Sequence, residues 1–187
     1  MGASSLFWYM GSTCSQPIAL PEGSYNVSLT VFSNLGSSAF VQAPMVVRNL
    51  LVVSMGDSVA SGEGNPEVNG FRTGDPSSKT FTITPAKWSD PRCHRSAYSG
   101  HALAARALED ADPHTSVTFL SVACSGAGIT EGLLGTYQGI EQFLGEEPGP
   151  LPSQIDQVKA ALSASACPTG NRGCPTDNSK RRIDAVL

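Results

Sequence analysis

The sequence predicts an α/β protein with a doubly wound parallel sheet, truncated at its third strand and preceded by a short β segment. Continuous apolar runs at residues 49–55, 117–123 and 183–187 fit central parallel strands that are covered on both faces. Residues 99–109, rich in Ala and Leu, and residues 152–162, apolar along one side, fit helices between those strands. Alternation of strand and helix is typical of a doubly wound sheet.

Residues 22–47 have a different character and predict β structure. Residues 25–32 alternate between apolar and polar side chains, which is the period of a half-buried strand, and a turn leads to a return strand at 39–47. The pattern Tyr-x-Val-x-Leu-x-Val followed by Asn-x-Gly resembles the last hairpin of a PKD-like or other immunoglobulin-type module. The predicted domains are a partial β-sandwich-like segment with a linker at 1–47 and a sheet domain at 48–187.

Composition excludes several classes of protein. The chain has 187 residues, 40% of them hydrophobic, so it can bury a core. Its net charge of −4 and its 15% of charged residues argue against a nucleic-acid partner, which would require a basic stripe. No apolar run is long enough for a membrane span. No Lys or Arg precedes Arg48, so a secretion signal, if there is one, is expected outside this chain.

The five cysteines indicate disulfide bonds and an oxidising compartment. Cys167 and Cys174 bracket a turn-rich loop that can close a small disulfide ring. A metal site is the alternative, but the chain has only three histidines and no Cys-x-x-Cys. We therefore expect no metal and no cofactor, and Cys14 is left without an assigned partner.

Gly56, Asp57 and Ser58 follow the first apolar run and form a candidate nucleophile turn. A serine nucleophile requires an exposed hydroxyl at a rigid turn, backbone N–H donors for the oxyanion, and a base. Ser58 and Gly126 both follow predicted strands, at the sheet edge where open α/β sheets bind ligands. The alternative is that Asp57 or Ser58 only caps a helix.

Longer strings around this turn resemble a known family. Residues 55–65, Met-Gly-Asp-Ser-Val-Ala-Ser-Gly-Glu-Gly-Asn, resemble the first conserved block of SGNH (GDSL-type) serine hydrolases. Residues 88–96 and 119–127 resemble two later stretches of secreted bacterial members, in the same order. The resemblance covers residues 48–187 and implies a flavodoxin-like SGNH fold and an esterase or lipase activity.

The resemblance also implies roles for individual residues. Ser58 corresponds to the nucleophile, and Gly126 to the glycine whose N–H stabilises the oxyanion. Gly56 and Asp57 would support the turn. The substrate would be a small-molecule or lipid ester, and the protein would be secreted. The implied disulfides are Cys93–Cys124 and Cys167–Cys174.

The base is the part of the family pattern that this sequence lacks. The third block, Gly-x-Asn-Asp, would be expected just after Leu187, and the Asp-x-x-His block is absent. Of the local histidines, His94 is the first candidate for a substitute base, ahead of His101 and His114. The alternative function is an inactive fragment or a binding or structural module. An unpaired sheet edge also predicts self-association of this chain.

Overall fold

The computed structural model describes two helices of three turns, one single helical turn and six strands. The strands are β1 (Gly23–Phe32), β2 (Ser38–Ser54), β3 (Phe71–Asp75), β4 (Thr80–Thr84), β5 (Thr115–Ser121) and β6 (Ala185–Val186). The helices are α1 (Ser58–Ser61), α2 (Gly100–Asp110) and α3 (Gln154–Ala164). The described residues are 18, 20–75, 77, 80–140, 149–164 and 182–187.

Strand β2 is the centre of a mixed sheet because its two halves have different partners. Its first half pairs antiparallel with β1, from Phe32 opposite Ser38 to Gly23 opposite Val47. Its second half pairs in parallel with β5 along residues 48–54. Val52 and Val53 also pair in parallel with the short strand β6. β2 therefore crosses the predicted domain boundary at residue 48 without interruption.

The prediction of a doubly wound parallel sheet is wrong. The structure is mostly β, with 39% strand and 18% helix, and its main sheet is mixed. The reason is local: nothing around Arg48 breaks the chain, so the alternating segment and the apolar run form one strand. The antiparallel hairpin is thereby fused to the parallel pairs, and β6 adds only two residues.

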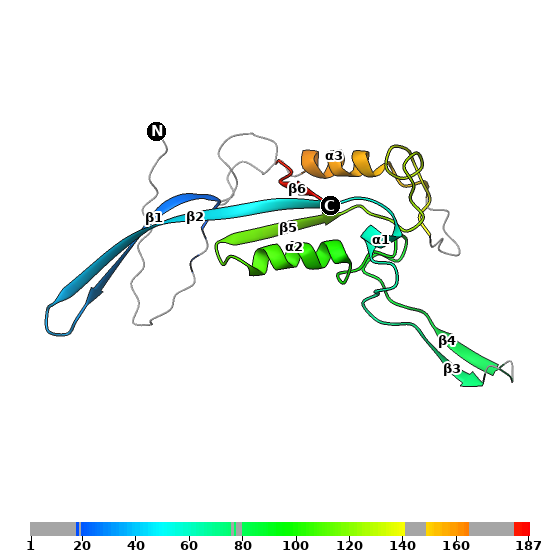
Figure 1. Cartoon of the computed structure of the whole chain (residues 1–187), viewed down its shortest axis with the longest axis horizontal. Helices are drawn as coiled ribbons and strands as arrows, with labels where there is room; N and C mark the ends of the chain where they lie inside the picture. Colours follow the sequence, from blue (N-terminus) through cyan, green and yellow to red (C-terminus); the bar gives the residue numbers. More distant parts are fainter. Residues whose placement is uncertain (1–17, 19, 76, 78–79, 141–148, 165–181) are drawn as a thin grey trace.

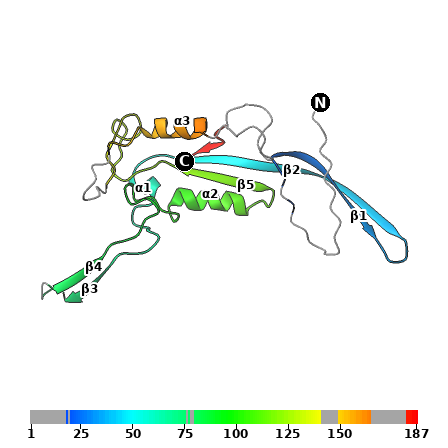
Figure 2. The same ribbon diagram turned by 180° about the vertical axis from the view of Figure 1, so that it is seen from behind.

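The core lies around the second half of β2. Leu51 and Val53 pack with Val122 after β5 and with Val158 of α3. Figures 1 and 2 show α3 on one side of the β2–β5 sheet and α2 on the other. Both helices begin at a serine: Ser99 Oγ accepts a hydrogen bond from Ala102 N–H, and Ser153 Oγ accepts one from Asp156 N–H, each at 3.1 Å.

A second hairpin, β3–β4, lies within residues 61–92, a segment rich in Gly, Pro, Ser and Thr in which no strand was predicted. Phe71 to Asp75 pair antiparallel with Thr80 to Thr84, and the Arg72 guanidinium lies 3.7 Å from the centre of the Phe81 ring. Aromatic and β-branched residues favour strands, but the Gly- and Pro-rich surroundings obscured this short signal. The hairpin projects away from the sheet, beyond α1 (Figure 1).

The edges of the sheet are relevant to the predicted self-association of this chain. Among the described residues, β5 pairs only with β2, and β6 pairs only with β2. Self-association through such an edge stays a prediction. In the described part of the chain, no helix combines the length and apolar character that a membrane span requires.

Candidate active site

The Gly56 turn is fixed by a buried glutamine. Gly56 has a φ of 131°, and a Cβ at this position would lie 3.1 Å from the Ala60 Cβ, so a side chain here would be strained. Gln154 at the start of α3 is fully buried. Its Oε1 accepts from Gly56 N–H and its Nε2 donates to Gly56 C=O, both at 2.8 Å. This pair of hydrogen bonds holds the backbone immediately before the candidate nucleophile.

Asp57 caps the single turn α1. Its carboxylate accepts a hydrogen bond from Val59 N–H at 3.0 Å, and its carbonyl accepts one from Ser61 N–H at 3.0 Å. The turn ends at Gly62, where φ is 104° and a Cβ would lie 2.9 Å from the Ser99 Cβ. Asp57 therefore shapes the turn that presents Ser58.

Ser58 is partly exposed at the first position of α1. Its carbonyl accepts hydrogen bonds from the N–H groups of Gly62 and Glu63, at 3.2 and 2.9 Å, and from the Ser61 hydroxyl at 3.0 Å. Within the part of the chain that the structure describes, the Ser58 hydroxyl and the Ser58 N–H make no hydrogen bond. Both groups are thus available to an incoming ligand.

The loop after β5 brings Gly126 to the same edge. Cys124 N–H donates to Gly56 C=O at 3.1 Å, and Ser125 N–H donates to Cys93 C=O at 3.0 Å. Gly126 has a φ of 83° and open space where a Cβ would be. No acceptor for the Gly126 N–H occurs among the described residues. The structure therefore places both predicted oxyanion donors on loops that contact each other.

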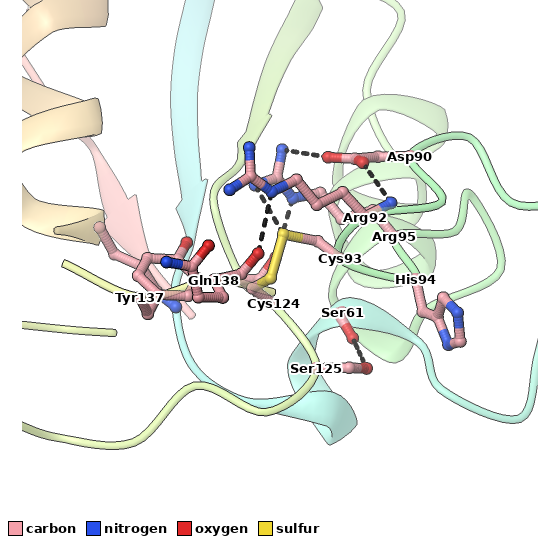
Figure 3. Close-up of a disulfide and its surroundings, with 12 residues drawn as sticks. Ser61, Asp90, Arg92, Cys93, His94, Arg95, Cys124, Ser125, Tyr137 and Gln138 are labelled. Atoms are coloured by element: carbon pink, nitrogen blue, oxygen red, sulfur yellow. Dashed lines mark hydrogen bonds and ion pairs between the residues drawn. A yellow bond between two sulfur atoms is a disulfide. The ribbon is translucent and has the colours of Figure 1, made fainter. Parts of the chain in front are cut away.

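The predicted disulfide Cys93–Cys124 is confirmed. Both cysteines are fully buried, and Tyr137 packs against them. Figure 3 shows the bridge between the loop before α2 and the loop after β5, with His94 directed away from it. Cys14, Cys167 and Cys174 lie outside the described residues.

A polar network that the sequence did not predict joins these loops. Ser125 Oγ donates to Glu63 Oε2 at 2.5 Å, and Ser61 Oγ lies 3.1 Å from Ser125 Oγ (Figure 3 shows the two serines facing each other). His94 Nδ1 lies 2.7 Å from the same Glu63 oxygen. The ring of His94 is stacked on Trp88, with centroids 4.4 Å apart and planes 7° apart.

Glu67 provides a second link between the loops around α1 and α2. Its carboxylate accepts hydrogen bonds from Ser89 N–H at 2.9 Å and from Ala97 N–H at 2.8 Å. Burial acts to raise the pKa of Glu67, but these backbone hydrogen bonds outweigh it, and the pKa is lowered. Glu67 holds the loops as Glu63 does, but it makes no contact with Ser125.

The histidines have partners other than Ser58. His94 pairs with Glu63, His101 Nδ1 lies 2.8 Å from Ser54 Oγ, and His114 Nδ1 lies 3.2 Å from Asp112 Oδ1. The Asp112 pKa is lowered by hydrogen bonds from His114 N–H and Thr115 Oγ1–H. None of these contacts places a histidine on the Ser58 hydroxyl.

A pocket of about 390 Å³ lies beside the turn. Asp57, Val59 and Ala60 contribute to its wall, whereas Ser58 is not among the lining residues. The remaining lining residues are mainly apolar: Met55, Gly56, His101, Ala127, Gly128, Ile129, Leu133 and Gln154. Among the described residues, no group of three His, Cys, Asp or Glu side chains is arranged to hold a metal ion.

Comparison with known proteins identifies no relative. No family model, no curated protein and no solved structure matches this chain.

Proposed function

We propose that this chain is a serine ester hydrolase with Ser58 as its nucleophile. One observation carries the proposal: among the described residues, the Ser58 hydroxyl and the N–H groups of Ser58 and Gly126 have no hydrogen-bond partner, and both residues lie in the segments that follow the parallel strands β2 and β5. The resemblance of residues 55–65 and 119–127 to SGNH hydrolases supports the same assignment. Ser58 supplies the hydroxyl and one N–H, and Gly126 supplies the other N–H.

The chemistry follows from these three groups. The Ser58 Oγ attacks the ester carbonyl carbon and loses its proton to a base. The N–H groups of Ser58 and Gly126 stabilise the negative charge that develops on the carbonyl oxygen. Departure of the alcohol leaves an acyl group on Ser58, and water then releases the carboxylic acid. Preorganised donors of this kind contribute about 10²–10³ each to kcat.

The proposal assigns a base to none of the three histidines. The sequence contains no Asp-x-x-His, and the described contacts of His94, His101 and His114 are to other residues. Removing the base from a serine hydrolase still leaves a rate above that of water. That residual rate comes from the oxyanion hole and from binding and does not require the serine, so only a signal that is lost in Ser58→Ala counts as evidence for the nucleophile.

The compartment and the substrate class belong to the same proposal. The Cys93–Cys124 disulfide is a bond that persists in oxidising surroundings, which supports an extracytoplasmic location. The substrate is a small-molecule or lipid ester, as the resemblance implies.

Covalent labelling and hydrolysis together test the proposal. A fluorophosphonate should label Ser58, and a short-chain chromogenic ester should be hydrolysed above background. Both signals should vanish in Ser58→Ala and persist in Ser28→Ala, a matched change on the exposed strand β1. Equal near-zero signals for the wild type and Ser58→Ala would refute the assignment.

A binding or structural module is the second candidate, and the β1–β2 hairpin favours it. Val27, Leu29, Val31 and Val41 are exposed, and the register places them on one face of the hairpin. A bare apolar face of this kind is typical of a surface that meets a partner. Absence of Ser58-dependent chemistry, together with binding that Val41→Asp removes, would favour this reading.

A further inference from the structure

Glu63 lies between the turn that carries Ser58 and the loop that carries Gly126. We propose that Glu63 is a positioning residue: by accepting hydrogen bonds from Ser125 and His94, it fixes the Gly126 N–H in the orientation that an oxyanion requires. This inference rests on the proposed function and assigns a role to a residue outside the nucleophile and the oxyanion donors.

The number of protons available determines which groups donate and which accept in the hydrogen-bond network around Glu63. An ionised carboxylate only accepts hydrogen bonds, so Ser125 Oγ–H and His94 Nδ1–H both donate to Glu63 Oε2. Ser125 has no second proton, so in its contact with Ser61 only the Ser61 hydroxyl can donate, and that hydroxyl shares its one proton with the Ser58 carbonyl, 3.0 Å from Ser61 Oγ. The Ser58 carbonyl remains satisfied by Gly62 and Glu63 N–H. The donors of Ser125, Ser61 and His94 then all have acceptors.

The network closes a ring with the disulfide. Glu63 holds His94 and Ser125, and each of these residues is next to one half-cystine of the Cys93–Cys124 bridge. The stack of Trp88 on His94 fixes the orientation of the imidazole. Ser125 is therefore held by its side chain, by its N–H on Cys93 C=O and by its bond to Cys124.

Fixing Ser125 also fixes the Gly126 N–H, because this N–H lies in the peptide plane that begins at the Ser125 carbonyl carbon. Gly126 itself has no side chain, its backbone is exposed, and its N–H has no acceptor among the described residues. Without Glu63, the plane would lose its side-chain restraint and be held only by the backbone hydrogen bonds from Ser125 N–H to Cys93 C=O and from Ala127 N–H to Cys124 C=O, so the donor would point at the oxyanion for a smaller part of the time. The loss of preorganisation should lower kcat by about 10- to 100-fold, which is less than the full loss of a donor.

The test compares Glu63→Ala and Glu63→Gln with Glu67→Ala. The control removes a carboxylate that also links two loops but does not contact Ser125. Kinetics on a short-chain ester should give a kcat that falls about 10- to 100-fold in Glu63→Ala, with KM changed less than about threefold, because substrate binding does not require the oxyanion donor. Glu63→Gln keeps one neutral acceptor and should retain an intermediate kcat. Glu67→Ala should keep kcat within about threefold.

Ser125→Ala breaks the same link from the other side. The double variant Glu63→Ala/Ser125→Ala should be no slower than the slower single variant, because both changes remove one interaction. Additive losses, or a kcat in Glu63→Ala no lower than in Glu67→Ala, would overturn the inference.

NMR spectra test this inference without requiring catalysis, and they therefore separate it from the proposed function. In ¹H–¹⁵N spectra, Glu63→Ala should shift or broaden the amide signals of residues 125–127 more than Glu67→Ala does. If the wild type shows no Ser58-dependent hydrolysis, the proposed function fails, and these amide signals still decide whether Glu63 holds the loop. Unchanged signals would refute the positioning role even in an active enzyme.

Discussion

The two halves of strand β2 share one backbone and differ in almost everything else. Up to residue 47 the strand pairs with β1 alone, and most of its side chains are exposed. From Leu51 to Ser54 it lies between β5 and β6, and all four side chains are buried. The first half depends on a single neighbour, whereas the second half is the centre of the core and ends at the candidate active site.

This difference teaches where stability and function lie. The hairpin contains no Asp, Glu, Lys, Arg or His between residues 23 and 47, and two strands alone are marginal in water. The carboxyl edge is held by a disulfide, a buried glutamine and the Glu63 carboxylate. Changes at the carboxyl edge should therefore affect folding and catalysis together, and changes in the hairpin should affect neither strongly.

The largest effect is expected from a matched pair of substitutions on β2. Val53 is 0% exposed and Val41 is 59% exposed. Val53→Asp would bury an unpaired charge and should lower the free energy of unfolding by about 4 kcal/mol or more, so that little folded protein remains. Val41→Asp should cost less than about 1 kcal/mol. Urea denaturation measures both, and similar losses at the two positions would contradict the division of β2.

Loss of the Cys93–Cys124 disulfide should have the next largest effect. The bridge spans 31 positions, and closing a loop of that length stabilises by about 3–4 kcal/mol in the chain-entropy account. In Cys93→Ala/Cys124→Ala, hydrogen exchange should accelerate in residues 119–127 and stay unchanged in residues 23–47. Equal acceleration in both segments would show that the halves of β2 do not behave independently.

Two glycines separate stability from catalysis. Gly36 in the β1–β2 turn has a φ of 85° and Gly126 has a φ of 83°. At both positions a Cβ would lie in open space, with nothing within 4 Å of it. Replacement by Ala should destabilise the chain by about 1 kcal/mol at either position. Ester hydrolysis should fall about tenfold or more in Gly126→Ala and stay unchanged in Gly36→Ala. Equal rates in the two variants would contradict the proposed role of the Gly126 N–H as an oxyanion donor.

The smallest effect is expected for the stability of Glu67→Gln, and it should depend on pH. The Glu67 pKa in the folded chain lies below its ordinary value of 4.5, so the stabilisation is present above that value and is lost as the pH falls through the lowered pKa. Glu67→Gln should therefore destabilise the chain at neutral pH, by less than about 1 kcal/mol, and the difference should shrink as the pH falls below 4.5. Thermal melts across this range measure the effect, and a difference that grows in acid would have the wrong sign.

Local patterns in the sequence predicted several elements well. Alternation predicted the hairpin that is now β1 and the first half of β2, and the helices predicted at 99–109 and 152–162 correspond to α2 and α3. The pairing of Cys93 with Cys124 came from the family resemblance. Each of these signals is either contained in a short window or carried by a motif.

The remaining features depend on partners that are far apart in the chain. The change of period near Arg48 suggested a domain boundary, and only the structure shows that one strand passes through it. Gln154 binds Gly56 across 98 positions and Ser125 binds Glu63 across 62, and no periodicity marks either glutamine or glutamate. Such contacts arise only after the sheet has brought the loops together.

The continuity of β2 also has a consequence for the order of folding. The hairpin can close from a turn that joins residues 32 and 38, and hairpins of this kind form within about 1–10 μs. The parallel pairs must join Arg48 to Thr115 and Val52 to Ala185, across 67 and 133 positions, which is entropically slower. Because both pairings share one backbone, the early hairpin would hold β2 extended as a template on which β5 and then β6 can dock.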